Sequence, residues 1–431
     1  MSDALRIGIA GLGTVGSGVI RLLSEQEKLL AQRCGRELVV TAVSARDRDK
    51  PRDFDMPDTA AWYDDPCALA QADDVDVVVE LVGGAEGPAR EIVETALRCG
   101  KQVVTANKAL LAIHGSSLAA LAEKVDRALC YEAAVCGGIP VIKAIREGLA
   151  ANRFERIYGI LNGTCNYILT QMEEHGAEFA AVLAEAQQLG YAESDPSFDI
   201  GGIDAAHKLS ILTSLAYGCQ VRFDAVFIEG IEDLTASDIR FARELGYRIK
   251  LLGLARRTEA GIEQRVHPCL VPLQTPIAEV SGVTNAVVAV GNYAGQTMFV
   301  GPGAGAEPTA SSVIADIVDI ARGLAMPPFA TPSSTLEDAP ISPMDRWQGA
   351  YYVRLTLLDQ PGSMAGITAV MAKHSVSIDS IIQRGRSPGA AVPVVMLTHK
   401  TEEARMARVL HEIAALEPVT ESPRVIRIER F

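Results

Sequence analysis

The residues best suited to chemistry are gathered in the stretch 190–208. Glu193 and Asp199 stand on a segment rich in Gly and Pro, and Asp204 precedes Lys208 by four residues. Side chains four apart share one face of a helix, so Asp204 and Lys208 can converge on a small substrate with both a positive and a negative end. The same spacing is typical of an exposed ion pair. The carboxylates upstream favour a polar pocket, because a buried lysine needs charged partners.

A helix must hold this pair in place. The residues after Lys208 include Leu209, Leu212 and Leu215, so the predicted helix has a buried apolar base from which its polar end projects. Asp204 falls in the first turn, where the helix dipole stabilises a carboxylate.

The first residues of the chain predict a nucleotide site. An apolar strand at 5–10 and an amphipathic helix that runs to about Leu30 flank a glycine-rich turn. In this arrangement the glycines let the backbone approach a pyrophosphate, and the helix N-terminus faces its negative charge. We therefore expect a dinucleotide cofactor at Gly11, Gly13, Thr14, Val15 and Gly16.

A second lysine follows another strand of the same domain. Lys108 ends the segment 105–108, at the carboxyl end of that strand, and doubly wound folds place their ligands at this edge. Lys108 can therefore reach a cofactor or a substrate carbonyl. A solvated loop lysine is the alternative.

Residues 132–140 leave a further strand through a glycine turn and enter a helix with a proline near its first turn. Backbone carbonyls beside the Glu132 carboxylate suit a hard monovalent cation, which takes oxygen ligands. A plain turn between two domains explains the same residues.

Cys165 stands at a predicted helix start, where the pKa of a thiol can be depressed and the thiolate can act as a nucleophile. This would suit an acylating aldehyde dehydrogenase. Such chemistry needs a histidine base, and none of the seven histidines lies in a comparable motif. We therefore expect Cys165 to pack or to line the substrate pocket.

The end of the second strand bears on the choice of cofactor. Arg46 stands there, and an arginine at this position can accept the 2′-phosphate of NADP, whereas an acidic residue would favour NAD. Arg46 therefore favours NADP over NAD.

Composition restricts the class of protein. With 431 residues, 48% hydrophobic and 22% charged, the chain should form two or three globular domains, and it has no apolar run long enough for a membrane span. A net charge of −14 argues against nucleic acid as a partner. Eight cysteines without a C-x-x-C pair predict reduced thiols, and an N-terminus that enters its first strand at once leaves no room for a signal peptide. We expect a cytoplasmic protein with a small-molecule substrate.

The order of elements predicts an α/β chain of three domains. Alternating strands and helices predict a Rossmann-type domain over 1–134, made discontinuous by a returning helix at 306–325. Residues 135–305 predict an α+β catalytic and dimerisation domain with an open, mostly antiparallel sheet. Five prolines give 326–348 the composition of a linker rather than a packed element. Residues 349–431 follow the order βαββαβ of a ferredoxin-like domain.

With these pieces in place, the chain resembles homoserine dehydrogenase of the form that ends in an ACT domain, over essentially all 431 residues. The most specific part of the resemblance comprises Ala186, Gly190, Asp195, Pro196, Asp199, Gly202, Asp204 and Lys208. The segments 11–16, 105–108, 132–140, 161–164 and 303–305 support it.

The resemblance implies the reversible NAD(P)H-dependent reduction of L-aspartate 4-semialdehyde to L-homoserine, on the route to threonine, methionine and isoleucine. Lys208 would be the proton donor and acceptor, and Lys108 would assist and touch both cofactor and substrate. Substrate-binding residues would be Glu193, Asp204 and Asp199, the last with a supporting role in shaping the pocket.

The resemblance also implies further ligands. Gly190 and Gly305 would contact the cofactor together with the glycine turn. A sodium ion would be held by Glu132 and by the carbonyls of Val135, Gly137 and Ile139. The ACT domain would bind threonine as a feedback effector, or serve only for dimerisation, and the chain would form a homodimer or homotetramer.

One residue departs from the family pattern, because a small hydroxylic residue is expected at Cys165. Two other functions stay open at this point. One is the acylating dehydrogenase that uses Cys165. The other is a non-enzymatic nucleotide or amino-acid sensor, which would have no reason to keep both lysines and the carboxylates.

Overall fold

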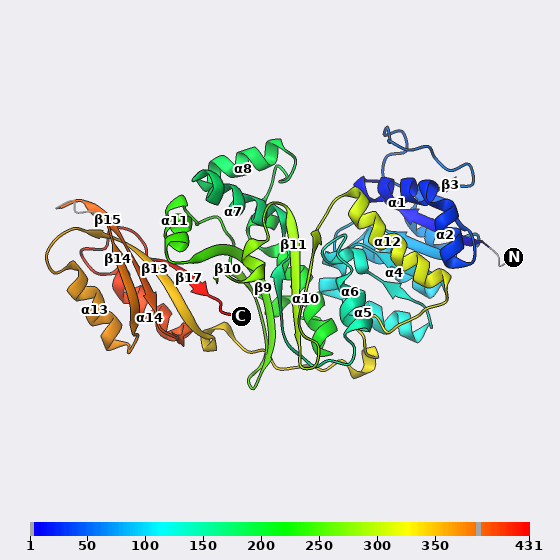
Figure 1. The fold of residues 1–431 in the computed structure, drawn as a ribbon. Coiled ribbons are helices and arrows are strands. Elements are labelled where there is room, and N and C mark those ends of the chain that lie inside the picture. Colours follow the sequence, from blue (N-terminus) through cyan, green and yellow to red (C-terminus); the bar gives the residue numbers. More distant parts are fainter. Residues whose placement is uncertain (1–3, 385–388) are drawn as a thin grey trace.

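The computed structural model describes residues 4–384 and 389–431, which form three α/β parts in a row (Figure 1). The N-terminal part stands at one end of the molecule, the part that contains 190–208 lies in the middle, and the C-terminal part stands at the other end.

Six parallel strands form the sheet of the first part, in the order β3-β2-β1-β4-β5-β6. Every residue of β4 is buried, as expected for a strand covered by helices on both faces. This is a doubly wound sheet, whose ligand site lies at the carboxyl ends of the strands. The strands are β1 (Leu5–Ala10), β2 (Leu38–Ser44), β3 (Ala61–Trp62), β4 (Val77–Glu80), β5 (Gln102–Thr105) and β6 (Leu129–Cys130). The helices are α1 (Thr14–Glu25), α2 (Glu27–Cys34), α3 (Pro66–Gln71), α4 (Pro88–Arg98) and α5 (Lys108–Lys124).

A helix from much later in the chain, α12 (Ala306–Ala321), returns to this part and lies beside α1 (Figure 1). The two helices meet at Gly18, where an added Cβ would stand 2.8 Å from the carbonyl oxygen of Ala306. Val313 of α12 is buried in the same apolar cluster as Ile7 of β1. The dinucleotide-binding fold is therefore discontinuous, as predicted.

The middle part packs helices against a mostly antiparallel sheet, with α10 on β7, β9 and β10. Its strands are β7 (Phe154–Ile160), β8 (Phe227–Ile228), β9 (Tyr247–Thr258), β10 (Gly261–Pro272), β11 (Thr284–Gly291) and β12 (Gly295–Pro302). Its α-helices are α6 (Val141–Lys143), α7 (Gly163–His175), α8 (Phe179–Gln188), α9 (Ser197–Ile200), α10 (Ile203–Tyr217) and α11 (Ala236–Glu244). Short 3₁₀ and π turns are η1 (Glu132–Ala134), η2 (Ala144–Gly148), η3 (Phe223–Ala225) and η4 (Pro276–Glu279).

The C-terminal part has the predicted βαββαβ order, with one additional two-residue strand. Its elements are β13 (Gln348–Leu358), α13 (Ser363–Lys373), β14 (Ile378–Gln383), β15 (Ala391–Thr398), β16 (Thr401–Glu402), α14 (Glu403–Ala414) and β17 (Arg424–Ile428).

This part is not a separate layer, because its sheet continues that of the middle part. Strand β17 pairs in parallel with β10, at Cys269 with Arg427 and at Leu270 with Ile428. One sheet of eleven strands therefore runs through both parts, with the main order β12-β11-β7-β9-β10-β17-β13-β15-β14. The sequence order of elements could not reveal this pairing, because the two strands are about 150 residues apart.

The segment 326–348 is packed, so its interpretation as a loose linker is wrong. Phe329 is buried against Tyr131, with 5.6 Å between the ring centroids. The backbone N–H of Ser333 donates to the carboxylate of Glu123 at 2.9 Å. Proline content indicated the lack of long regular elements, but the tertiary contacts of the remaining side chains decide whether such a segment packs.

The first helix also differs from the prediction. A single helix to about Leu30 was expected, but the chain breaks at Gln26 into α1 and α2. Within α2, Leu30 is the one buried residue. Apolar periodicity continues through such a break, so it is not visible in the sequence.

In the described part of the chain, no helix has both the length and the apolar character required to cross a membrane. All eight cysteines are free thiols.

Candidate active site

Lys208 and Asp204 form a buried ion pair at the start of α10. The Lys208 Nζ donates to Asp204 Oδ2 and to the carbonyl oxygen of Leu161, both at 2.8 Å. The side chains are only 9% and 4% exposed. The helix begins after Gly202, whose φ of +85° lies in the left-handed region that glycine adopts freely. The interpretation as an exposed surface pair is therefore wrong.

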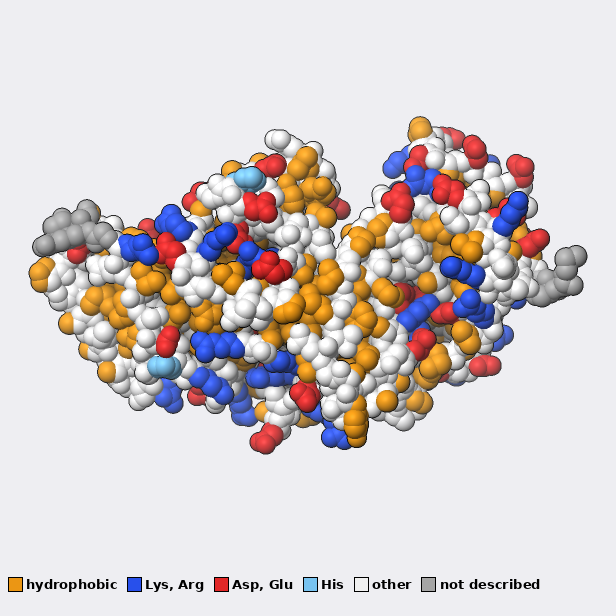
Figure 2. All heavy atoms as spheres, in the orientation of Figure 1, with side chains coloured by type: hydrophobic (Ala, Val, Ile, Leu, Met, Phe, Trp, Pro, Cys, Tyr) orange, Lys and Arg blue, Asp and Glu red, His pale blue; other side chains and the backbone are white. Residues whose placement is uncertain are grey.

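Lys108 reaches the same carboxylate from the first part of the molecule. Its Nζ lies 3.0 Å from Asp204 Oδ1, so each of the two lysines binds a different oxygen of one carboxylate. Lys108 is the first residue of α5, and Asn107 caps this helix by accepting a hydrogen bond from the Leu110 N–H. A cleft between the middle part and the first part is visible at the top of the space-filling view (Figure 2). The solvated-loop interpretation of Lys108 is also wrong.

Asn162 joins the two carboxylates of the site. Its Nδ2 donates to Asp199 Oδ1 and to Asp204 Oδ2, both at 2.8 Å. Its Oδ1 accepts the Cys165 N–H and so caps α7. Sequence reasoning did not assign a site role to Asn162. The available signal was an asparagine directly before a predicted helix. It does not indicate a site residue, because ordinary helix N-caps are also asparagines.

The charges of this cluster shift one another. Burial by itself would raise the pKa of Asp204, but Lys208 and Lys108 outweigh it and lower that pKa below its usual range. Burial opposes the charge of Lys208, yet Asp204 raises the pKa of its ammonium group. Burial and the neighbouring Asp204 raise the pKa of Asp199. Lys208 therefore keeps its positive charge beside a carboxylate that stays ionised.

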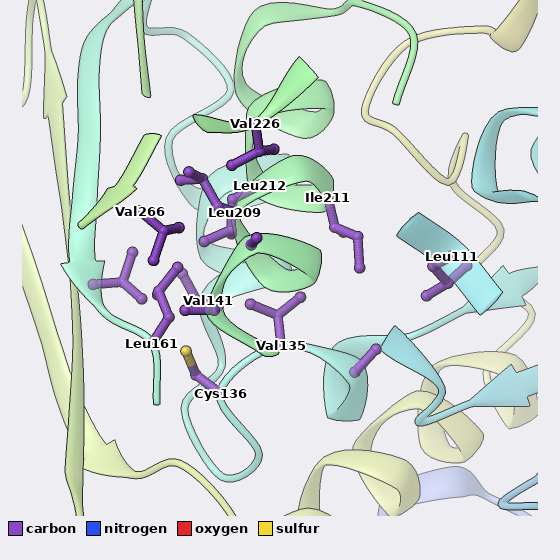
Figure 3. Close-up of a cluster of buried hydrophobic side chains, with 14 of the residues drawn as sticks. Leu111, Val135, Cys136, Val141, Leu161, Leu209, Ile211, Leu212, Val226 and Val266 are labelled. Atoms are coloured by element: carbon purple, nitrogen blue, oxygen red, sulfur yellow. The ribbon is translucent and has the colours of Figure 1, made fainter. Parts of the chain in front are cut away.

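Buried apolar side chains surround α10, the helix that carries Asp204 and Lys208 (Figure 3). Leu209 and Leu212 of α10 belong to one buried cluster with Leu161, Val135 and Val141. The helix that carries Asp204 and Lys208 thus rests on a close-packed base, as the sequence predicted.

Cys165 is buried below the site and is not poised as a nucleophile. Its Sγ donates to the Asp199 carbonyl oxygen at 3.1 Å, and burial raises its pKa well above the usual value. His207 of α10 lies edge-on against Phe198 and Phe223, and burial lowers its pKa to about 4. Nothing in this arrangement generates a thiolate, so Cys165 has the packing role that was expected.

The glycines of the turn between β1 and α1 have two different roles. Gly11 has φ +106°, and an added Cβ would stand 2.5 Å from the carbonyl oxygen of Leu81. At Gly16 an added Cβ would stand 2.1 Å from the Gly11 carbonyl oxygen. Gly13 has no described atom within 4 Å of that position. Gly11 and Gly16 shape the turn, whereas Gly13 leaves open space before the N-terminus of α1 at Thr14 and Val15, the place where a pyrophosphate is bound in this arrangement.

Glu80 orders the carboxyl edge of this sheet and was missed by sequence reasoning. Its carboxylate is fully buried and accepts the N–H groups of Val82 and Gly83 and the hydroxyl of Thr105. Burial raises its pKa. Glu80 thereby links the loop after β4 to the loop that carries Lys108. In the sequence it is one acidic residue at a strand end, without a distinguishing signal.

The remaining predicted cofactor and substrate residues lie around this centre without touching it. Arg46 is exposed just beyond β2. Gly190 and Glu193 lie on the exposed loop between α8 and α9, and the Glu193 carboxylate makes no hydrogen bond or ion pair within the described ranges. Gly305 has φ +120° and immediately precedes α12, which packs on α1.

The predicted sodium residues form a compact turn between the first and middle parts. Glu132 is buried, and its carboxylate accepts the N–H groups of Ile142 and Lys143, both at 2.8 Å. Burial and nearby Asp316 raise the pKa of Glu132 to about 7. The carbonyl oxygens in question belong to Val135, Gly137 and Ile139. That of Gly137 accepts from Ser312 Oγ at 2.7 Å, and that of Ile139 accepts from the Val141 N–H at 2.7 Å.

Comparison with known proteins decides the family. The homoserine dehydrogenase family matches residues 140–318, the homoserine dehydrogenase NAD-binding domain matches 11–132, and the ACT domain matches 351–418. The homoserine dehydrogenase of Pseudomonas aeruginosa is 46% identical over 99% of both chains, and that of Helicobacter pylori is 41% identical over the whole of both. This chain belongs to the homoserine dehydrogenase family.

Solved homoserine dehydrogenases share its fold. The enzyme from Thiobacillus denitrificans superimposes with a TM-score of 0.91 at 45% identity, covering 99% of this chain and 98% of the other. The Staphylococcus aureus enzyme gives 0.78 at 29% identity over 99% of both chains. A hyperthermophilic archaeal homoserine dehydrogenase in complex with NADPH gives 0.64 at 28% identity, covering 74% of this chain and 98% of the other.

As a homoserine dehydrogenase, the chain is an oxidoreductase that interconverts L-aspartate 4-semialdehyde and L-homoserine with a nicotinamide cofactor. The predicted combination of a Rossmann-type domain, a mixed-sheet catalytic domain and an ACT domain is confirmed. The non-enzymatic sensor and the acylating dehydrogenase are not supported.

Proposed function

We propose that Lys208 exchanges the proton with the substrate oxygen and that Asp204 holds Lys208 for this task. The observation that carries the proposal is the buried ion pair of these residues, placed where Lys108 of the cofactor-binding part meets the middle part. The cofactor, when bound, supplies or accepts the hydride. In the reduction the carbonyl oxygen gains negative charge, and the charged Lys208 donates its proton there.

The oxidation direction needs a neutral Lys208, and the substrate itself helps to provide it. Asp204 raises the pKa of Lys208 in the ligand-free site. A substrate ammonium group that shares Asp204 adds a positive charge near Lys208 and lowers that pKa toward the working range. Lys108, which is bound to the second oxygen of Asp204, adds to the same effect and contacts cofactor and substrate.

The carboxylates of the site bind the ammonium group of the substrate. Asp204 lies within the ion pair, and Asp199 is tied to it through Asn162. The Glu193 carboxylate has no hydrogen-bond or ion-pair partner within the described ranges, so it is available to the substrate from the loop before α9. Charge-assisted bonds of this kind are among the strongest that a polar substrate can make.

The test follows NADPH oxidation with aspartate semialdehyde. Lys208→Ala should lower kcat by at least about a hundredfold, the usual loss when a general acid is removed. Cys165→Ala, which changes another buried residue of the site, is the control. Its kcat should stay within about threefold of that of the wild type. A Lys208→Ala enzyme with normal kcat, or a dead Cys165→Ala enzyme with a normal melting temperature, overturns the assignment.

For the cofactor we propose NADP(H) in preference to NAD(H). The support is the exposed guanidinium of Arg46 beyond β2, together with the NADPH complex of the archaeal relative. The glycine turn with Thr14 and Val15, Gly190, Lys108 and Gly305 would line the cofactor. Arg46→Ala should raise the KM for NADPH about tenfold and leave that for NADH within twofold, whereas exposed Arg33→Ala on α2 should change neither. Equal effects on both cofactors contradict the proposal.

We further propose that the turn 132–139 holds a sodium ion. The donors present fit a hard cation, because they are all oxygens and each carbonyl that already accepts one hydrogen bond keeps a second lone pair. Glu132 and the carbonyls of Val135, Gly137 and Ile139 would bind the ion and stiffen the turn between the two parts. NaCl should raise the melting temperature more than choline chloride at equal ionic strength, and Glu132→Gln should abolish the difference.

The ACT domain fits a regulatory role, and we propose threonine as the effector. A hollow of about 370 Å³ lies at the turn between β13 and α13, lined by residues 357–365, Gln383 and Val392. It is large enough for one small amino acid. Dimerisation without a ligand is the alternative.

A continuous set of contacts leads from this domain to the active site. Arg427 of β17 binds Glu229 at 2.7 Å. Two residues further along the chain, the N–H of Ile231 donates to the carbonyl oxygen of Ile200 at 2.9 Å. Ile200 ends the short helix α9, which carries Asp199. A shift of β17 would therefore move a carboxylate of the site.

Point variants test this route better than removal of 349–431, which would expose buried charged residues along β10. Arg427→Gln should reduce inhibition by threonine at least fivefold and change the KM for aspartate semialdehyde, and Arg427→Lys should restore part of both. Arg354→Gln breaks a second ion pair between the same parts, to Asp238 at 2.7 Å, and is the matched control. Absence of threonine inhibition in the wild type contradicts the effector assignment.

We propose a homodimer or homotetramer in the cytoplasm. The edge strand β12 ends the eleven-stranded sheet, and Val300 and nearby Tyr293 are 54% and 85% exposed. An exposed apolar strand edge is a place where a second copy can pair. Light scattering across a concentration series should give two or four chains, and Val300→Lys should shift the mass downward.

A further inference from the structure

A row of cations follows the amino-terminal edge of the parallel sheet, opposite the cofactor turn. Arg36 and Arg127 each stand two residues before a strand, β2 and β6, and Lys101 stands one residue before β5. Arg6 is the second residue of β1. These positions are scattered along the sequence, but parallel strands begin at one edge of a sheet, and the strand order brings them together.

The four side chains line a groove of about 800 Å³. Among the described residues that line the groove, Asp76 is the single carboxylate, and Arg6 binds it with bonds of 2.7 and 3.0 Å. Arg36 also acts on this carboxylate and helps to lower the pKa of Asp76, so the described lining carries four cations and one carboxylate, a net excess of three positive charges. This local excess of positive charge occurs in a chain whose net charge is −14.

Hydrogen bonds from these cations to nearby backbone carbonyls explain only part of this arrangement. Lys101 Nζ donates to the carbonyl oxygen of Ala72 at 2.7 Å, and Arg127 donates from Nε to that of Gly100 at 2.5 Å and from Nη1 to that of Asp126 at 2.6 Å. A lysine has three donor hydrogens and an arginine five, so most remain for another partner. Arg36 Nε is buried and has no hydrogen-bond partner within the described ranges.

We propose that this groove binds a small anion with two or more linked phosphate groups, such as a nucleoside diphosphate or triphosphate. A net excess of three positive charges along the described lining matches a ligand of two to three negative charges, and the guanidinium fork fits phosphate oxygens in pairs. The groove has the size of a site for a molecule of this class. Like-signed charges along a concave surface concentrate the field that attracts it.

The groove is distinct from the cofactor site. The six residues of β1 span about 20 Å between the two edges of the sheet. The anion site therefore acts independently of the residues assigned to catalysis, and it can be filled while the cofactor is bound.

Inorganic tripolyphosphate is the probe, titrated by calorimetry into the full chain saturated with NADPH, which keeps the cofactor site closed to it. One equivalent per chain should bind, and affinity should fall at least tenfold between about 50 and 200 mM salt, as expected for a charge-driven contact. Adenosine triphosphate in the same experiment distinguishes a nucleotide from a simple polyphosphate. If it binds more tightly than tripolyphosphate, the groove also binds the nucleoside.

Arg36→Gln/Lys101→Gln should weaken tripolyphosphate binding at least tenfold with an unchanged melting temperature. Arg408→Gln/Lys400→Gln removes the same charge from exposed positions of the ACT domain and should bind like the wild type. If the first variant does not fold, Arg127→Lys, which keeps the charge and alters the fork, should still weaken binding. No binding by the NADPH-saturated wild type, or equal binding by both double variants, overturns the proposal.

Discussion

Asp204 and Lys208 lie one helical turn apart, and the 2.8 Å ion pair between them is buried on an apolar base. The carboxylate keeps the ammonium group charged, and the ammonium group keeps the carboxylate ionised. Each residue thus sets the protonation state of the other, which gives the pair a measurable pH signature.

Asp204→Asn should lower the pKa of Lys208, because it removes the nearest opposite charge from a buried ammonium group. In the reduction direction the charged lysine is the proton donor, so the alkaline loss of kcat should move to lower pH by about one unit or more. A pH profile of kcat between 6 and 10.5 measures the shift. A profile that moves to higher pH, or an unmoved one with normal kcat, contradicts the proposed role of the pair.

Asn162 can be tested without disturbing the helix it caps. Asn162→Ser keeps a side-chain oxygen that can accept the Cys165 N–H, but it cannot donate to two carboxylates. We expect a stability change below about 1 kcal/mol and a rise in the KM for aspartate semialdehyde of about tenfold, since Asp199 and Asp204 lose their common donor. Thermal unfolding and steady-state kinetics measure the two effects. A normal KM would show that the bridge does not position the carboxylates.

The glycine turn should separate folding from cofactor binding. Gly13→Ala places a methyl group in open space and should change the free energy of unfolding by less than about 1 kcal/mol, while it raises the KM for NADPH because it fills the approach to the phosphates. Gly11→Ala is the contrasting variant. Its Cβ would meet the Leu81 carbonyl and its φ is +106°, so it should lose stability. Urea denaturation with and without NADPH tests both.

Lys250 should give the chain an alkaline gain in stability. It is buried, donates to Asn166 Oδ1 at 3.0 Å and to the Val280 carbonyl oxygen at 2.5 Å, and burial with nearby Arg248 lowers its pKa to about 8. Below pH 8 the folded and unfolded chains both carry the charge, and its burial penalty is present in full. As pH rises from 8 to 10.5, the folded chain loses the proton first and the penalty disappears.

The wild type should therefore gain up to about 3 kcal/mol relative to Lys250→Met across this range. Denaturation curves of both chains at pH 7.5 and 10 measure the difference, and the comparison removes the contribution of other groups that titrate there. A wild type that gains nothing over the variant would show that Lys250 titrates normally.

The sequence by itself determined most of the local structure and the outline of the site. The turn from Gly11 to Gly16 predicts a strand, a phosphate-binding bend and a helix, because the glycines are required by backbone geometry at close range. The spacing of Asp204 and Lys208 places both on one helical face for the same local reason. The resemblance to homoserine dehydrogenase, now confirmed, rested on such short motifs.

Only the tertiary structure decided what these residues meet. Lys108 approaches Asp204 from another part of the molecule, and Asn162 joins Asp199 to Asp204 across about 40 residues of chain. The pairing of β17 with β10 is of the same kind. Such contacts depend on which helices and strands pack together. That packing is decided by the burial of many apolar side chains, so the polar residues that it brings into contact carry no recognisable sequence pattern.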